Sequence, residues 1–173
     1  SGTAIKGDDG TFEGTTGKYD ETIPSDATSF YGRSKALGEI RNDRNVTLRT
    51  SIVGPDSNPK GIGLFQWFMK QENEVGGYSK VIWTGVTTIE LAKQIEVAIK
   101  NNLTGLNHVV NNDFISKKDL LALFKESFNK DIAINDNDTV VSEKTLVRTD
   151  KSYNFDVPSY KQMVEEMRTW VDN

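Results

Sequence analysis

Hydrophobic and polar positions along this chain follow two different spacings, one typical of strands and one typical of helices, and segments of the two kinds alternate. Apolar and polar residues alternate through Val46, Leu48, Thr50 and Ile52, as they do in a strand, and Gly54-Pro55 ends the run. Between residues 88 and 99, apolar residues recur every three or four positions, which is the spacing of one helix face. Strand and helix patterns continue to alternate toward the C-terminus, which predicts an α/β fold.

Four helices are expected to begin at side chains that can cap a helix, namely Ser29, Thr87, Ser116 and Ser159. Thr87 and Glu90 have the spacing of a capping box, in which each side chain accepts from the other's backbone N–H. The aromatic-rich segment 63–69 is expected to form a further, short helix. The side chains expected to pack the four capped helices into the core are Phe30, Leu37, Leu91, Ile95, Ala98, Ile99, Leu120, Leu121, Leu123, Phe124, Phe128, Met163, Met167, Trp170 and Val171.

The intervening segments predict short strands and turns. Strands are expected at 81–83, 106–110 and 131–134, with a turn at Gly76-Gly77 and loops at 56–61 and 135–138. Residues 1–28 are rich in Gly, Thr and Asp and contain one strand candidate, around Thr11-Phe12. We therefore expect a loose N-terminal segment at 1–28 and an α/β domain at 29–173.

Composition excludes several classes of protein. A hydrophobic content of 36% is sufficient for a core in a chain of 173 residues. The net charge of −4 provides no basic field for nucleic acid or anionic membrane, and no apolar run approaches the about 20 residues that span a bilayer. The absence of cysteine excludes disulfides and thiolate zinc sites and suits a reducing compartment. We expect a cytoplasmic protein that binds neither nucleic acid nor membrane.

The pair Tyr31 and Lys35 carries the most chemical information. Four residues apart on the expected helix, the two side chains share one face. An ammonium beside a phenol favours the phenolate, so such a pair can transfer protons as a general acid/base. Tyr and Lys at this spacing also occur simply as surface residues, and the pattern therefore needs support from the rest of the sequence.

Three segments provide that support. The run Tyr-Gly-Arg-Ser-Lys-Ala-Leu-Gly-Glu, from Tyr31 to Glu39, resembles the catalytic helix of the extended short-chain dehydrogenase/reductases that modify nucleotide-linked sugars. Residues 48–55 resemble the strand and loop that follow that helix. Residues 83–92 resemble a turn and helix start of the dTDP-4-dehydrorhamnose reductase branch. The order and spacing agree, and the resemblance extends from about Phe12 to the C-terminus.

This resemblance implies that the chain is the C-terminal portion of such an enzyme. It would comprise part of a Rossmann-type sheet and a small α/β region that binds substrate. Neither G-x-G-x-x-G nor G-x-x-G-x-x-G occurs in the 173 residues, so the half that binds the cofactor pyrophosphate is expected to be absent. Residues 29–173 would then form the catalytic-helix and substrate-binding domain.

The chemistry that the resemblance implies is reduction of the C4 ketone of a nucleotide-linked 4-keto-6-deoxy sugar, with NADP or NAD as cofactor. Tyr31 would donate a proton to the ketone oxygen. Lys35 would favour that transfer and hydrogen-bond the nicotinamide ribose, so both residues are catalytic and cofactor-binding candidates. The candidates for substrate binding, taken from segment position, are Arg49, Gly54, Trp67 and Trp83.

One departure from the family pattern concerns a third catalytic group. The family uses a Ser or Thr hydroxyl from a Ser-Thr-Asp-x-x-Phe-x-Gly segment to hold the substrate carbonyl. Aligning Phe12 and Gly14 with that segment places Asp8 where the threonine belongs and Asp9 on the aspartate. A carboxylate would repel the charge that develops on the carbonyl oxygen. The first residues are therefore interpreted as a non-native junction, and the isolated chain is expected to be inactive.

Other chemistry-bearing residues favour structural interpretations. The aromatics Phe65, Trp67 and Phe68 are expected in the core, with the wall of a sugar pocket as the alternative. His108 is the only histidine and lies between apolar neighbours, so it is expected to be structural or on the surface, and no metal site is expected. Acidic pairs such as Asp136 and Asp138 are interpreted as solvated turns.

Two alternatives to a reductase remain open. The chain could be a sugar-nucleotide binding module without catalysis. It could also be a domain fragment with no function of its own, whose exposed apolar surface would allow a homodimer to form.

Overall fold

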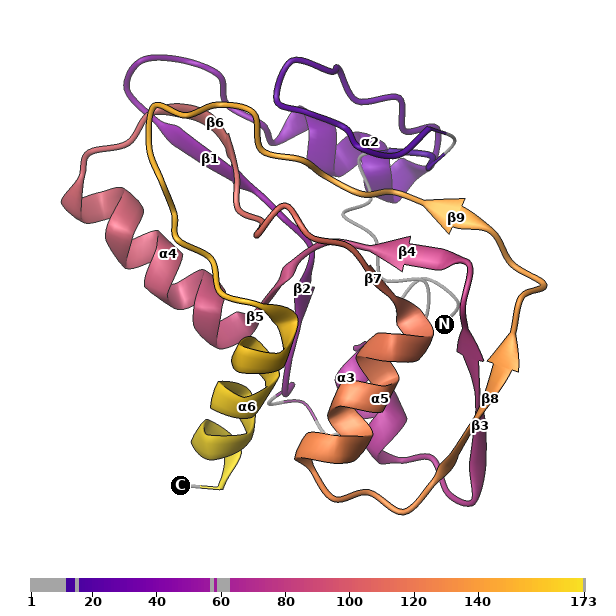
Figure 1. Cartoon of the computed structure of the whole chain (residues 1–173). Helices are drawn as coiled ribbons and strands as arrows, with labels where there is room; N and C mark the ends of the chain where they lie inside the picture. Colours follow the sequence, from indigo (N-terminus) through magenta and orange to yellow (C-terminus); the bar gives the residue numbers. More distant parts are fainter. Residues whose placement is uncertain (1–11, 15, 57, 59–62, 173) are drawn as a thin grey trace.

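The computed structural model describes residues 12–172, apart from residues 15, 57 and 59–62. Its elements follow in the order α2 (Phe30–Leu37), β1 (Val46–Arg49), β2 (Ile52–Val53), α3 (Leu64–Met69), β3 (Glu74–Tyr78), β4 (Val81–Trp83), β5 (Val86–Thr87), α4 (Thr88–Lys100), β6 (Gly105–His108), β7 (Ile115–Ser116), α5 (Lys117–Ser127), β8 (Ala133–Asn137), β9 (Ser142–Glu143) and α6 (Tyr160–Val171). The expected α/β fold is confirmed (Figure 1).

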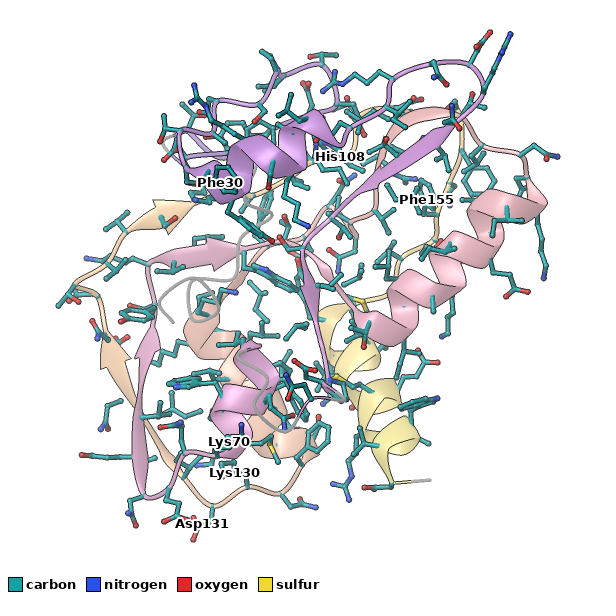
Figure 2. All side chains as sticks on the ribbon, turned by 180° about the vertical axis from the view of Figure 1, so that it is seen from behind. Phe30, Lys70, His108, Lys130, Asp131 and Phe155 are labelled. Carbon is teal, nitrogen blue, oxygen red and sulfur yellow. The ribbon has the colours of Figure 1, made fainter. Side chains whose placement is uncertain are left out.

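Short parallel pairs of strands run through the molecule. β1 pairs with β6 and β2 pairs with β5, both in parallel. Thr50 and Ser51 alone separate β1 from β2, so one stretch of chain contributes to both pairs. β3 pairs in parallel with β8, and β4 lies between antiparallel β7 and parallel β9. In Figures 1 and 2, α2 and α4 lie on opposite sides of the β1–β6 pair, which makes this part of the fold three-layered.

Two apolar clusters hold these elements together. The larger one joins α3, α5 and α6, and the ring of Phe124 on α5 contacts Phe65 and Phe68 on α3. In the smaller cluster, Phe12 and Tyr19 stack at 4.0 Å and pack with Val110 and Leu146. The described part of the N-terminal segment is therefore packed against the rest of the chain through the smaller cluster.

The packing expected of α2 is wrong. Phe30 and Leu37 are 90% and 87% exposed, and Gly32 is the buried residue of this helix. In the strand that follows, Val46 and Ile52 are exposed, Leu48 is partly buried against the larger cluster, and Arg49, Ser51 and Val53 are buried. The reason is that the face of β1 toward α2 is occupied by a polar cluster, described below, which an apolar pattern does not reveal.

The apolar stripe expected on α4 is also wrong in part. Ile95 and Ile99 are exposed, whereas Glu90, Gln94 and Ala98 form the buried face. The Thr87 hydroxyl caps the helix by accepting from the Glu90 N–H at 3.2 Å, as expected. The Glu90 carboxylate, however, accepts from Gln94 Nε2 at 2.5 Å. Burial of this acid–amide pair replaces the expected apolar contact.

The glycines at 76 and 77 lie within β3 and do not form the expected turn. A Cβ at Gly77 would lie 2.7 Å from Ile134 Cγ2 and 2.9 Å from Lys118 Cγ, so this glycine lets α5 and β8 approach the strand closely. β8 extends to Asn137 and includes residues that were expected in the acidic loop.

The remaining elements agree with expectation to different degrees. α3, α5 and the strands β4 and β6 form where they were expected, and α5 buries Leu120, Leu121 and Phe124. On α6, Met163 and Met167 are buried as expected, but Trp170 and Val171 are exposed. Phe12 lies in no strand, and Thr11 falls outside the described residues, as does most of the loop expected at 56–61.

Phe124→Ala should lower the free energy of unfolding by about 3–5 kcal/mol, because it leaves a cavity among the fully buried rings of the larger cluster. Phe30→Ala is the matched control, since that ring is exposed, and should change the stability by less than about 0.5 kcal/mol. Urea denaturation of both variants measures the difference. Equal losses in the two would contradict the placement of α2 at the surface.

Candidate functional site

Helix α2 places Tyr31 and Lys35 side by side, as expected. The Ser29 hydroxyl accepts from the Gly32 N–H at 3.0 Å and so fixes where the helix begins. One turn apart, the Lys35 Nζ lies 5.4 Å from the centroid of the Tyr31 ring. This is within the range of a cation–π contact. The Tyr31 side chain is half exposed, at 49%, so its phenol is accessible to a ligand.

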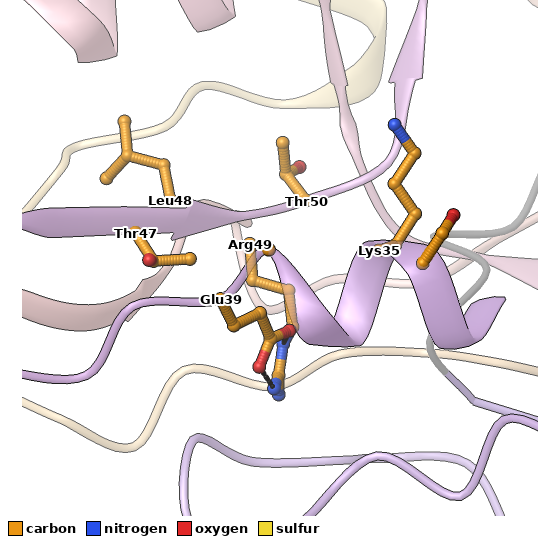
Figure 3. Close-up of a pocket in the computed structure, with 8 residues that line it drawn as sticks. Lys35, Glu39, Thr47, Leu48, Arg49 and Thr50 are labelled. Atoms are coloured by element: carbon orange, nitrogen blue, oxygen red, sulfur yellow. Dashed lines mark hydrogen bonds and ion pairs between the residues drawn. The ribbon is translucent and has the colours of Figure 1, made fainter. Parts of the chain in front are cut away.

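A cavity of about 360 Å³ opens between α2 and β1 (Figure 3). Lys35 forms part of its wall, and its side chain extends from the helix toward the chain next to Thr50. Tyr31 lies on the same helix but is not among the residues that line the cavity, which are Ser34, Lys35, Gly38, Glu39, Thr47, Leu48, Arg49 and Thr50. The cavity wall therefore includes the Lys35 ammonium, and the Tyr31 ring lies beside that ammonium but outside the lining.

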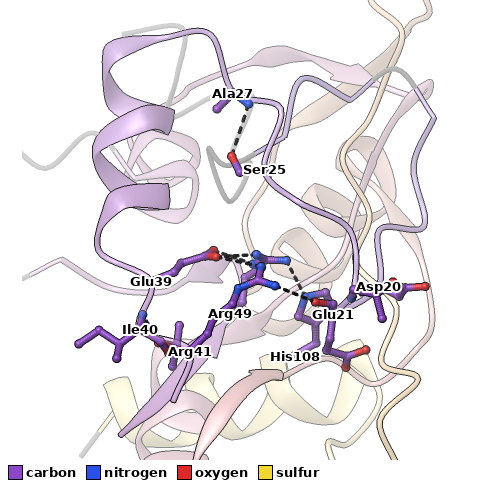
Figure 4. Close-up of polar contacts among 11 residues, drawn as sticks. Asp20, Glu21, Ser25, Ala27, Glu39, Ile40, Arg41, Arg49 and His108 are labelled. Atoms are coloured by element: carbon purple, nitrogen blue, oxygen red, sulfur yellow. Dashed lines mark hydrogen bonds and ion pairs between the residues drawn. The ribbon is translucent and has the colours of Figure 1, made fainter.

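A largely buried ion pair, drawn in Figure 4, contributes two of the residues that line this cavity. Arg49 Nε donates to Glu39 Oε1 at 2.8 Å and Arg49 Nη2 donates to Glu39 Oε2 at 2.7 Å, so the pair is bidentate. The two side chains are only 3% and 11% exposed. Arg41 approaches Glu39 from the surface at 3.4 Å. The guanidinium of Arg49 also lies 5.1 Å from the centroid of the Phe12 ring.

His108 completes the cluster from β6. It is fully buried, and its Nε2 lies 3.1 Å from Arg49 Nη1 while its Nδ1 lies 2.9 Å from the Val147 carbonyl oxygen (Figure 2). A guanidinium can only donate, so Nε2 must accept and Nδ1 must carry the proton that is donated to Val147. The geometry thus assigns His108 the neutral Nδ1–H tautomer. The expectation that this histidine is structural agrees with its contacts.

The electrostatics of the cluster favour a charged Glu39 and a neutral His108. Burial raises the pKa of the Glu39 carboxyl, but hydrogen bonds and charge from Arg49, assisted by Arg41, outweigh it and leave that pKa below its usual value. Burial lowers the pKa of His108, against the opposing influence of the Val147 carbonyl and Glu21, so that the pKa stays below its usual value.

Arg49, a candidate for substrate binding, lines the cavity, and its side chain has partners within the chain. Three of its N–H groups are directed to Glu39 and His108, and its side chain is buried. Arg49 therefore contributes to the cavity wall with much of its hydrogen-bonding capacity directed to Glu39 and His108.

Trp83 also differs from its expected role. It is 3% exposed and packs in the larger cluster, with its ring 5.9 Å from that of Tyr160 and 4.9 Å from Lys117 Nζ. Its side chain presents no surface to a ligand. Trp67 is partly buried against the same cluster, which agrees with the interpretation of the aromatic segment as core. Neither tryptophan lines the cavity at Lys35.

Gly54 follows β2 and also lies outside the cavity lining. A Cβ at this position would lie 2.3 Å from Thr88 Oγ1, so the close approach of β2 to the start of α4 explains the glycine. The sequence-based candidates are therefore not brought together as one group. Lys35 and Arg49 line the cavity and Tyr31 lies beside Lys35, whereas the three remaining candidates, Gly54, Trp67 and Trp83, lie outside the lining.

Asp8, Asp9, Thr11 and Thr15, from which the third catalytic group was sought, lie outside the described residues. In the part of the chain that is described, no group of three or more His, Asp or Glu side chains could hold a metal ion. No helix of the described part combines the length and apolarity needed to cross a membrane.

Sequence reasoning did not identify Glu39 as part of the site, although a signal was present. Tyr31, Lys35 and Glu39 follow one another at intervals of four residues, although α2 ends at Leu37 and Glu39 lies just beyond its capping residue Gly38. The alternation of residues in β1 does not by itself show which side of the strand faces α2. Pairing the positive charge of Arg49 with the negative charge of Glu39 would have identified that side.

Comparison with known proteins identifies the fold. No protein-family model matches the sequence, and no curated protein matches it. Among solved structures, dTDP-4-dehydrorhamnose reductase from Bacillus anthracis, crystallised with NADP, matches 95% of this chain and 63% of its own, with a TM-score of 0.74 and 19% identity. The corresponding reductase from Clostridium acetobutylicum matches 95% and 64%, with a TM-score of 0.77 and 17% identity.

Enzymes of other activities share the same fold. UDP-N-acetylglucosamine 4-epimerase from Methanobrevibacter ruminantium, in complex with UDP-N-acetylmuramic acid, matches 95% of this chain and 60% of its own, with a TM-score of 0.70 and 16% identity. The chain spans less than two thirds of each of these structures. Over most of its length, this protein therefore has the α/β fold of part of the dTDP-4-dehydrorhamnose reductases and related sugar-nucleotide enzymes.

Proposed function

We propose that this chain provides the proton-donating helix and the substrate side of an NAD(P)-dependent reductase of nucleotide-linked 4-keto-6-deoxy sugars. The observation that carries the proposal is the contact between Lys35 and Tyr31, with Lys35 in the wall of a cavity of about 360 Å³. The likeness to reductases and epimerases that act on nucleotide-linked sugars supports the substrate class.

In this proposal, Tyr31 donates its phenolic proton to the C4 oxygen while a hydride is added to C4, so the ketone becomes an alcohol. Lys35 lies beside the ring, and its positive charge stabilises the phenolate left behind. The half-exposed phenol is accessible for this transfer. A nicotinamide cofactor, when bound, supplies the hydride.

The residues present fit only one end of that cofactor. The Lys35 ammonium, which faces the cavity, is a donor suited to the ribose hydroxyls next to the nicotinamide. A pyrophosphate needs a glycine-rich turn at the start of a helix, and the 173 residues contain no such motif. We therefore propose that these residues by themselves do not turn over substrate.

A coupled assay tests this proposal. With NADPH and a dTDP-linked 4-keto-6-deoxy sugar, the chain should oxidise NADPH no faster than the buffer blank, because the positioning of the hydride donor is lacking. Tyr31→Phe serves as the matched control, since it removes only the proton donor. Oxidation above the blank that disappears in Tyr31→Phe would show that the isolated chain is an enzyme.

Binding of the sugar nucleotide can be measured separately by calorimetry, with dTDP- and UDP-linked sugars as probes. We expect Lys35→Ala to weaken binding more than Lys100→Ala, because Lys35 lines the cavity whereas Lys100 forms an exposed ion pair with Glu96. Binding unaffected by Lys35→Ala would place the ligand elsewhere. Binding without turnover in any longer form of the protein would favour the alternative, a non-catalytic sugar-nucleotide binding module.

A further inference from the structure

Helix α2 has little apolar contact with the rest of the molecule. Its large apolar side chains, Phe30 and Leu37, are exposed, and Gly32 is its buried residue. Helix α5, in contrast, buries Leu120, Leu121 and Phe124 in the larger cluster. Burial of apolar area is the usual force that docks a helix on a sheet. Something other than apolar packing must therefore hold α2 in place.

Both ends of α2 are attached through carboxylates. At its start, Glu13 Oε1 accepts from the N–H and the hydroxyl of Thr28, at 2.7 and 2.8 Å. At its end, Glu39 follows the capping residue Gly38 by one position and enters the bidentate pair with Arg49 of β1. The second attachment is the buried one, and it joins the helix directly to the sheet.

His108 determines where the Arg49 side chain lies. Its Nε2 accepts from Arg49 Nη1, and its Nδ1–H is anchored on the Val147 carbonyl oxygen. The Phe12 ring covers the guanidinium from the N-terminal segment. The bidentate pair is thus held from β6 and from two loop segments. Next to it, the Thr47 hydroxyl of β1 accepts from the Ile40 N–H at 3.0 Å and donates to the Ile40 carbonyl oxygen at 2.9 Å, which also ties the end of α2 to the strand.

We propose that Glu39, Arg49 and His108 form a polar latch that positions α2 against the sheet, and with it Tyr31 and Lys35. The latch consists of positioning residues, which act through the helix and do not touch a reacting atom. The significance of the positioned pair rests on the proposed function, whereas the latch itself is a property of the fold.

A buried ion pair is suited to this role more than to raising overall stability. Removing two charges from water costs about as much as their attraction returns, so such a pair adds little net stability when both members are present. Removing one member leaves an uncompensated buried charge, which is strongly unfavourable. The docked position of α2 is therefore specified by the pair, and losing one partner should release the helix.

Glu39→Gln tests the latch, with Glu96→Gln as the matched control, because Glu96 also forms an ion pair, with Lys100, but is exposed. Hydrogen exchange of the folded chain at pH 7 gives the readout. In Glu39→Gln, the amides of α2 should exchange at least about tenfold faster relative to those of α5 than in the parent protein. Glu96→Gln should leave that ratio unchanged. Equal acceleration of both helices, or of neither, would overturn the proposal.

A second readout follows the cavity between α2 and β1. Lys35 of α2 and Thr50 after β1 line the same cavity, so the chemical shifts of Thr50 should change when α2 is released in Glu39→Gln, and the change should be smaller in Glu39→Asp. A residue with a merely structural role would not move this signal selectively. Neither readout requires a ligand or turnover, so failure of the latch and failure of the proposed function are distinguishable.

The tautomer of His108 can be tested without any variant, which keeps the proposal falsifiable if Glu39→Gln does not fold. His108 is the only histidine, so one pair of imidazole nitrogen signals reports it. Nitrogen-15 spectra at pH 7 should show a protonated Nδ1 and an unprotonated Nε2. A protonated Nε2 would be incompatible with donation from Arg49 and would overturn the assignment of His108 to the latch.

Acid should open the latch. The charged groups facing His108 are Arg49 from β1, Glu39 from the end of α2, and Glu21 and Asp20 from the N-terminal segment. Because the folded pKa of His108 lies below its unfolded value of about 6.5, the unfolded state takes up the proton first. The stabilisation is therefore complete above about pH 6.5 and decreases as the pH falls toward the folded pKa.

Glu39 adds to the effect at lower pH, since its folded pKa lies below the unfolded value of about 4.5 and its contribution is lost as the pH falls through the folded value. The protection of α2 amides relative to α5 should therefore fall as the pH decreases below about 6.5, and His108→Gln should remove that slope. A slope that persists unchanged in His108→Gln would show that another group controls the opening.

Discussion

The bidentate ion pair between Glu39 and Arg49 is the constraint on which the arrangement around the cavity depends. Its two charges are nearly removed from water, and each is compensated by the other with charge-assisted hydrogen bonds of 2.7 and 2.8 Å. Because Glu39 follows α2 and Arg49 ends β1, satisfying the pair brings helix and strand together. The cavity at Lys35 is the space left between them.

The ion pair is itself supported by the strand pairing, whereas the other helices depend on apolar packing. Arg49 is oriented by His108 of β6, the parallel neighbour of β1, so the strand register places donor and acceptor within reach. The larger apolar cluster lies apart from these polar contacts and supports α3, α5 and α6. Burial of apolar side chains thus holds α3, α5 and α6 together. The part of the molecule that carries Tyr31 and Lys35 is held by the ion pair between Glu39 and Arg49.

Local sequence patterns predicted only those contacts of the candidate site that join residues close together in the sequence. The proximity of Tyr31 and Lys35 follows from helical spacing and from the cap at Ser29, and both were foreseeable. The environment of Arg49 was not, because its partners come from the end of another element and from a strand 59 positions away. Trp83 was assigned to substrate by segment position, whereas its neighbours Tyr160 and Lys117 place it in the core.

The sequence by itself determined the class of the fold, the beginnings of the helices and the pairing of a phenol with an ammonium, since these depend on residues a few positions apart. Tertiary structure alone decided which residues are buried on α2, β1, β2 and α4, whereas α5 buries the apolar residues that its sequence predicts. Val46, Ile52, Ile95 and Ile99 are exposed although their spacing is apolar, while Glu90 and Arg49 are buried. The reason is that a side chain's surroundings depend on partners distant in sequence, and a buried charge is acceptable wherever the fold supplies its counterpart.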